Sequence, residues 1–142
     1  MYNTILVPLD GSKRAEAILR HVEDLALRYR AKVVFLQVVD LPPTELQPLK
    51  FGQEEFERWT REAEAYLAAR GGEFREKGVE AQWRVVYGPI VEAIISAAGR
   101  EGADLIAMAS HGRTGLSRVF YGSVAAGVLH RVDRPLLLVR SL

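Results

Sequence analysis

The chain has 142 residues, close to the usual size of one domain, and its 49% hydrophobic and 26% charged residues are typical of a globular protein. Its 19 basic and 18 acidic side chains give a net charge of +1 without a long block of one sign, which argues against nucleic acid or an anionic membrane as partner. Cysteine is absent, so disulfides, thiolate metal sites and cysteine nucleophiles are excluded.

The chain starts with MYNTILVPLDGS, which has neither a basic n-region nor a cleavage-like site. No apolar run approaches the roughly 18 residues that are needed to cross a bilayer. We therefore expect a cytoplasmic protein that makes no membrane contact.

Short runs rich in β-branched and aliphatic residues predict five strands. Most are nearly continuous in apolar character, as expected of parallel strands that are covered on both faces. In the third run Gln82 and Arg84 alternate with Trp83 and Val85, which is typical of a half-exposed edge strand. The predicted strands are Thr4–Leu9, Lys32–Val39, Glu80–Tyr87, Ala103–Ser110 and Pro135–Arg140.

Between these runs, apolar residues recur every three to four positions and predict amphipathic helices. The second helix is expected to end at Gly71–Gly72 or at Gly78, and Trp83 is expected to pack against it. The helical patterns extend from Ala15 to Tyr29, from Phe56 to Arg70, from Ile90 to Ala98 and from Val124 to Val132.

Strands and helices therefore alternate, with connections too long for hairpins. This order predicts an α/β fold with a parallel sheet, in a single domain that covers residues 1–142. The segment DLPPTELQPLKFGQ (Asp40–Gln53) contains three prolines. We expect it to be irregular and regard it as a candidate mobile flap.

Two of the predicted strands end in unusual sequences. The first is followed by Asp10 and Gly11, and the fourth leads into the glycine-rich and serine-rich stretch MASHGRTGLSRVFYGSVAAG (Met108–Gly127). Ligands of open parallel sheets bind at the carboxyl ends of the strands, where the chain reverses its winding direction. If these two strands are neighbours, both loops face one crevice.

The glycine-rich stretch has the chemistry of a phosphate-binding loop. Gly112 and Gly115 suit a turn, because glycine accepts positive φ and lets backbone N–H groups approach a ligand. Gly122 and Ser123 stand before the last helix, so Ser123 is expected to cap it while neighbouring amides point at an anion. Arg113 supplies a charge-assisted hydrogen bond in this interpretation.

The same stretch also allows a purely structural interpretation without a phosphate. A glycine-rich turn before a serine-capped helix is also how a chain leaves a strand when no ligand is bound. Asp10, in the sequence Asp-Gly-Ser, likewise fits a turn or the start of a helix.

The stretches ILVPLDGS and DLIAMASHGRTGLSRVFYGSVAAGVLHRVDRPLLLV resemble the universal stress proteins, and the likeness extends over nearly the whole chain. ATP-binding members of that family carry the pattern Gly-x2-Gly-x9-Gly-Ser/Thr. Gly112 and Gly122-Ser123 match its last two elements, and Ala109 stands at the place of the first glycine. The resemblance implies a Rossmann-like, open, five-stranded parallel sheet of order 3-2-1-4-5 with helices on both faces.

The resemblance also implies an ATP site with a magnesium ion that Asp10 helps to position. The residues implied around the adenosine are Pro8, Leu9, Asp10 and Val38, with Met108 and Ala109 on the ribose side. The residues implied at the phosphates are His111, Gly112, Arg113, Gly122, Ser123, Val124 and Ala125.

We therefore expect an ATP-binding stress or signalling module with little or no turnover. Phosphoryl transfer needs a positioned metal, cations and an oriented nucleophile, whereas Asp10 is the acidic residue placed near the crevice and the phosphate loop lacks lysine. The alternatives are a slow ATPase or adenylyl-transfer enzyme, and an interaction module that binds no nucleotide.

The last predicted strand is also a candidate interface. Its residues Leu136–Arg140 are apolar up to the final arginine and carry no internal proline, so as an edge strand it invites pairing with a second copy. The family resemblance implies the same homodimer.

Overall fold

The five predicted strands form one parallel sheet in the computed structural model, which describes residues 1–40, 49–111 and 122–141. The strand order is β3-β2-β1-β4-β5, as expected, so β1 lies in the centre and β3 and β5 at the edges. The strands are β1 (Thr4–Pro8), β2 (Lys32–Val39), β3 (Ala81–Tyr87), β4 (Leu105–His111) and β5 (Leu136–Ser141).

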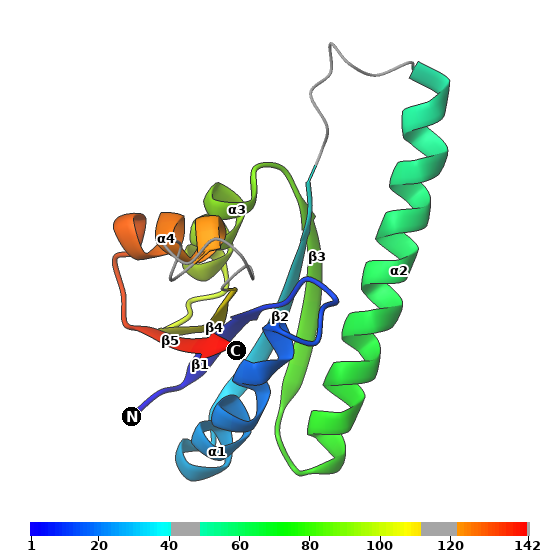
Figure 1. Ribbon diagram of the computed structural model, residues 1–142. Helices are drawn as coiled ribbons and strands as arrows, with labels where there is room; N and C mark the ends of the chain where they lie inside the picture. Colours follow the sequence, from blue (N-terminus) through cyan, green and yellow to red (C-terminus); the bar gives the residue numbers. More distant parts are fainter. Residues whose placement is uncertain (41–48, 112–121, 142) are drawn as a thin grey trace.

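Helices cover both faces of this sheet (Figure 1). They are the 3-10 helix η1 (Ala15–Ile18) and the α-helices α1 (Leu19–Tyr29), α2 (Leu49–Glu76), α3 (Ile90–Arg100) and α4 (Gly122–Arg131). In the described part of the chain, no helix is both long and apolar enough to span a membrane.

The alternation of side chains along the strands produces two hydrophobic clusters. Ile5 and Val7 of β1 face a cluster that also contains residues of η1, α1 and α2, while Leu6 faces one that contains residues of α3 and α4. All three residues are fully buried. Because β1 is buried on both faces, its continuous apolar sequence follows from its central position.

The third strand is a half-exposed edge, as its alternating sequence predicts. β3 pairs in parallel with β2, from Val33 opposite Ala81 to Val39 opposite Tyr87. At its outer side, Arg84 donates a hydrogen bond to the carbonyl of Trp83 at 2.9 Å and another to the side chain of Gln82 at 3.0 Å. A charged side chain thus covers part of this sheet edge, which hinders pairing with other chains.

The expectation for the segment Asp40–Gln53 is wrong at its C-terminal end, because α2 begins at Leu49. The three prolines all precede that residue, so none of them removes a hydrogen bond from the helix. Residues 41–48 lie outside the described part. The flap interpretation of those residues stays a prediction.

The C-terminal end of α2 is determined by one of the three candidate glycines. The helix continues through Gly71 and Gly72 to Glu76, and Gly78 follows with φ of +88°. An L-residue rarely adopts that left-handed conformation, so Gly78 is the glycine that ends the helix. Gly71 instead lets α2 approach the sheet, since a Cβ there would lie 2.3 Å from Cε3 of Trp83.

Gly71 and Gly72 therefore provide a matched test of this packing. We expect Gly71→Ala to destabilise the protein by about 1–3 kcal/mol, because the added methyl collides with the Trp83 ring. Gly72→Ala should stabilise it by up to about 1 kcal/mol, since a Cβ at Gly72 meets no atom within 4 Å and alanine favours the helix. Urea denaturation of both variants measures the difference. Equal effects would contradict close packing at Gly71.

Candidate functional site

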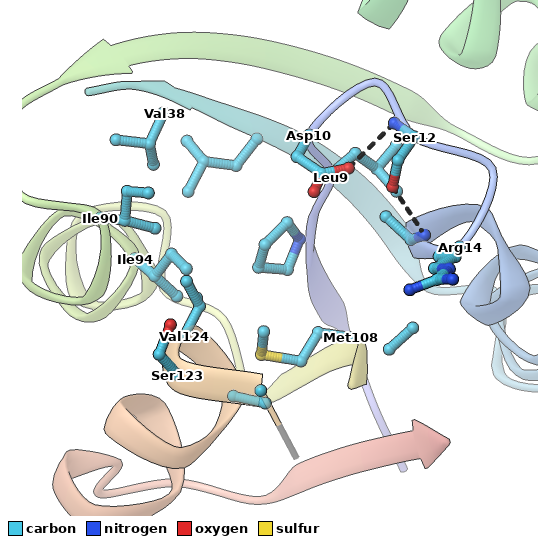
Figure 2. A pocket seen from close by; sticks show the side chains of 16 residues that line it. Leu9, Asp10, Ser12, Arg14, Val38, Ile90, Ile94, Met108, Ser123 and Val124 are labelled. Carbon is cyan, nitrogen blue, oxygen red and sulfur yellow. Dashed lines mark hydrogen bonds between the residues drawn. The ribbon is translucent and has the colours of Figure 1, made fainter. Parts of the chain in front are cut away.

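A cavity of about 540 Å³ lies at the carboxyl end of the sheet, between the ends of β1, β2 and β4 and the start of α4 (Figure 2). This volume is within the range of small-molecule sites. β1 and β4 are paired neighbours, as a shared crevice requires, and the loop after β1 lines this cavity. The loop after β4 (residues 112–121) lies outside the described residues, so its place at the crevice stays a prediction. The predicted site residues that line the cavity are Pro8, Leu9, Asp10, Val38, Met108, Ala109, Gly122, Ser123, Val124 and Ala125.

The other predicted site residues are not part of this described lining. Gly112 and Arg113 lie outside the described residues, as does the side chain of His111, whose backbone ends β4. The roles assigned to these residues stay predictions.

The position of the cavity follows from the winding of the chain. β1 continues through η1 and α1 on one face, whereas β4 continues toward α4 on the other face. The helices that follow β1 and β4 thus lie on opposite faces of the sheet, an arrangement that opens a crevice at the carboxyl ends of these strands.

One end of the cavity is apolar. Val38 of β2 and Ile90 and Ile94 of α3 point into this end, and Met108 of β4 lies between it and the far side (Figure 2). Leu36 lines the same region and shares the face of Val38, because it lies two residues earlier on β2. These walls suit a flat apolar group such as a nucleobase.

Sequence reasoning missed several lining residues. Leu36 was predictable from the period of two along its strand, and the spacing of Ile90 and Ile94 puts both on one face of α3. No sequence signal showed that this face reaches the carboxyl edge. The lining residues missed from the sequence are Ser12, Arg14, Ala15, Leu36, Ile90 and Ile94.

The loop after β1 forms the polar side of the cavity. Oδ1 of Asp10 accepts a hydrogen bond from the backbone N–H of Ser12 at 2.9 Å, and Oγ of Ser12 accepts one from the N–H of Ala15 at 3.2 Å. Gly11 between them has φ of +85°. Asp10 is thus a turn residue and also a cavity residue, so the two interpretations of its sequence are compatible.

The first turn of α4 forms another wall. α4 begins at Gly122, which has φ of +70°, so Ser123 lies in the first turn, and the expectation that it precedes the helix is wrong. The N–H groups of a first helical turn have no partner within the helix, and the helix dipole is positive there. Gly122 and Ser123 therefore present donors that suit an anion.

Ala109 occupies an ordinary strand position. It pairs with Val139 of β5, is 5% exposed, and belongs to the hydrophobic cluster below η1. Among the described residues other than glycine, positive φ occurs at Arg30 and not at Ala109. The methyl group consequently causes no backbone strain and fills space in the core.

Behind the cavity loop, a polar cluster connects η1 to α2. The Tyr66 hydroxyl donates to Oε2 of Glu16 at 2.5 Å, and Arg70 approaches the same oxygen at 3.4 Å. Burial, and next the hydrogen bond to Glu16, raises the pKa of Tyr66 well above its usual value. The cluster fixes the position of η1, whose first residue lines the cavity.

The sheet order and the crevice at its switch point define an α/β protein of the Rossmann-like class. Comparison with known sequences gives the family: the profile of the Universal stress protein family matches residues 1–140. The chain belongs to the universal stress protein family.

One relative from the archaea is similar over nearly its full length. Universal stress protein MJ0577 of Methanocaldococcus jannaschii is 32% identical to this chain in an alignment of 155 positions. The alignment covers 99% of this chain and 96% of the relative. The solved structure of MJ0577 has a TM-score of 0.89 with this chain and covers 100% of it, with 98% of its own chain covered.

Two more distant structures share the fold. The universal stress protein of Archaeoglobus fulgidus in complex with dAMP is 21% identical with a TM-score of 0.70, covering 96% of this chain and 97% of its own. A universal stress protein in complex with cAMP is 23% identical with a TM-score of 0.68, covering 99% and 98%.

Replacing Ala109 tests whether its position needs glycine. We expect Ala109→Gly to destabilise the protein by about 0.5–1 kcal/mol, because glycine in a strand loses more backbone entropy on folding and the core loses a methyl group. Thermal and urea unfolding measure the change. An increase in stability would show that the alanine is strained.

Proposed function

We propose that this protein binds ATP with Mg²⁺ in the cavity between β1 and β4 and acts as a nucleotide-dependent stress or signalling module in the cytoplasm. One observation carries the proposal. The same cavity has an apolar end at Val38 and Ile90 and, at Gly122 and Ser123, a helix N-terminus whose amides suit phosphate.

The solved relatives support the ligand class. Proteins of this fold were determined with dAMP and with cAMP, both of which are adenine nucleotides. We extend this class to the present chain because its cavity offers the two environments that an adenine nucleotide requires.

The lining residues suggest how ATP lies. The base packs against Val38, with Pro8, Leu9 and Asp10 bordering the adenosine and Met108 and Ala109 on the ribose side. The phosphates lie at residues 122–125 and at His111, Gly112 and Arg113. Mg²⁺ commonly takes one or two protein carboxylates together with phosphate oxygens, and the Asp10 carboxylate at the cavity fits that role.

We propose little or no turnover. Among the described lining residues Asp10 is the acidic one, and it already accepts a hydrogen bond from Ser12. Phosphoryl transfer also needs a group that orients the nucleophile. Steady release of phosphate or pyrophosphate would instead favour the alternative of a slow ATPase or adenylyl-transfer enzyme.

The first experiment is isothermal titration of the protein with ATP and Mg²⁺, after removal of carried-over nucleotide. We expect micromolar affinity in the wild type and a loss of at least about tenfold in Gly122→Asp, because the carboxylate repels the phosphates at the start of α4.

Gly102→Asp is the matched control for this titration. Gly102 has φ of +66°, close to the +70° of Gly122, but it precedes β4 and does not line the cavity. The control therefore places the same charge at a glycine of similar φ that lies away from the cavity. Equal affinity of the two variants would contradict a phosphate site at Gly122, and absence of wild-type binding would favour a nucleotide-free interaction module.

We also propose a homodimer through Leu136–Arg140. β5 pairs with β4 on one side and is the edge of the described sheet on the other. The backbone N–H of Ile106 donates a hydrogen bond to the carbonyl of Pro135. In this register the backbone N–H and C=O groups of the odd-numbered residues of β5 point toward β4, and those of the even-numbered residues point outward.

This register predicts the effect of proline in β5. Leu138→Pro removes an outward N–H while it spares the pairing with β4, so we expect sedimentation to change from a dimer of about twice 15.8 kDa to a monomer. Leu138→Ala keeps the N–H and should retain the dimer. A wild-type protein that sediments as a monomer would contradict the interface.

A further inference from the structure

Arg14 brings a positive charge to the cavity from the segment between β1 and η1. It is the residue before η1, and its side chain extends from there toward the cavity that Asp10 and Met108 also line (Figure 2). Among the described lining residues it is the basic one. Sequence reasoning assigned the cation to Arg113 instead, which lies outside the described residues.

The backbone of Arg14 is held at a defined place. Its carbonyl accepts a hydrogen bond from the N–H of Ala17 at 3.2 Å, and the hydroxyl of Ser12 accepts one from the N–H of Ala15. Ala15 and Ile18 of η1 are buried in the core below. The backbone from which the guanidinium extends is therefore already ordered, so ligand binding does not have to order it.

Arg14 and the apolar end lie on opposite sides of the cavity. Val38, Ile90 and Ile94 gather at one side, Arg14 stands at the other, and Met108 lies between them (Figure 2). A base seated against Ile90 is thus remote from Arg14. A group attached to that base meets the guanidinium only if it is long enough to cross the cavity.

The charges of the cavity lining indicate that the group that reaches Arg14 is a phosphate. The described lining contains two charged side chains, those of Asp10 and Arg14, and each phosphate added to a nucleotide increases its negative charge. A guanidinium binds phosphate oxygens through two parallel hydrogen bonds, with a geometry that a lysine ammonium does not offer.

We infer that Arg14 binds the terminal phosphates of a nucleoside triphosphate and thereby makes the site prefer triphosphates to monophosphates. This inference rests on the proposed function, since it assumes that the base occupies the apolar end. Arg14 is then the residue that determines ligand specificity by phosphate number. The start of α4 serves the phosphates nearer the ribose.

The test is calorimetric titration of the wild type, Arg14→Gln and Arg14→Lys with ATP and with AMP, each in the presence of Mg²⁺. Arg14→Gln should weaken ATP binding about ten- to a hundredfold, the range for a hydrogen bond to a charged group, and leave AMP within about twofold. Arg14→Lys should restore part of the ATP affinity. Lys13→Gln removes the same charge from an exposed neighbour that does not line the cavity, and it should change neither affinity.

The outcomes separate the two proposals. If Arg14→Gln weakens ATP and AMP equally, or if Lys13→Gln has the same effect as Arg14→Gln, the specificity role is overturned while nucleotide binding stands. If the wild type binds neither nucleotide, the proposed function fails and the role of Arg14 fails with it. Circular dichroism serves to verify that each variant is folded. The side-chain substitutions keep the backbone carbonyl of Arg14 that accepts the hydrogen bond from Ala17.

Discussion

β1 lies at the centre of the sheet, and its burial on both faces is the constraint on which the site depends. Ile5, Leu6 and Val7 are completely inaccessible to solvent, and each such side chain contributes about 1.5–3 kcal/mol when it is fully buried. That burial requires helices on both faces, and helices on both faces require connections that leave neighbouring strands in opposite directions. The cavity between β1 and β4 is the geometric result.

The core also determines how rigid the polar side of the cavity is. η1 begins immediately after the loop of Asp10 and Ser12, and it is held from below by buried Ala15 and Ile18. From the side, Glu16 of η1 binds Tyr66 of α2. A loop at the rim of a cavity thus takes its position from contacts outside the cavity, as expected where a site must be preformed.

The sequence predicted the elements well where one pattern dominates. Buried strands have continuous apolar runs and β3 has an alternating one, so the strands and the exposed edge followed from periodicity. The parallel sheet followed from the alternation of strands with helices. The ends of α2 did not follow from periodicity, because Gly71 ends a helix only if its conformation is left-handed. Contact with Trp83, a residue of the neighbouring strand, explains this glycine instead.

The lining residues of the cavity likewise differ in how far the sequence predicted them. Asp10 was predictable because it follows the first strand, and its position in the chain brings it to the carboxyl edge of the sheet. Met108 lies within β4 and was placed at the site by the family resemblance. Ile90 and Arg14 were not predictable, since a helix face or a side-chain direction must be known before either is placed at the cavity. Periodicity shows which residues share a face, but packing decides what that face meets.

Ala109 shows how a binding site can tolerate changes of sequence. Its methyl group is buried in a core cluster while its backbone keeps the extended conformation of β4, so the residue belongs to the core as much as to the cavity. In the proposed site, the phosphates bind mainly to backbone amides, which most side-chain changes leave in place. Discrimination among ligands then falls to the few side chains with charge, Asp10 and Arg14, whose replacement alters electrostatics without altering the fold.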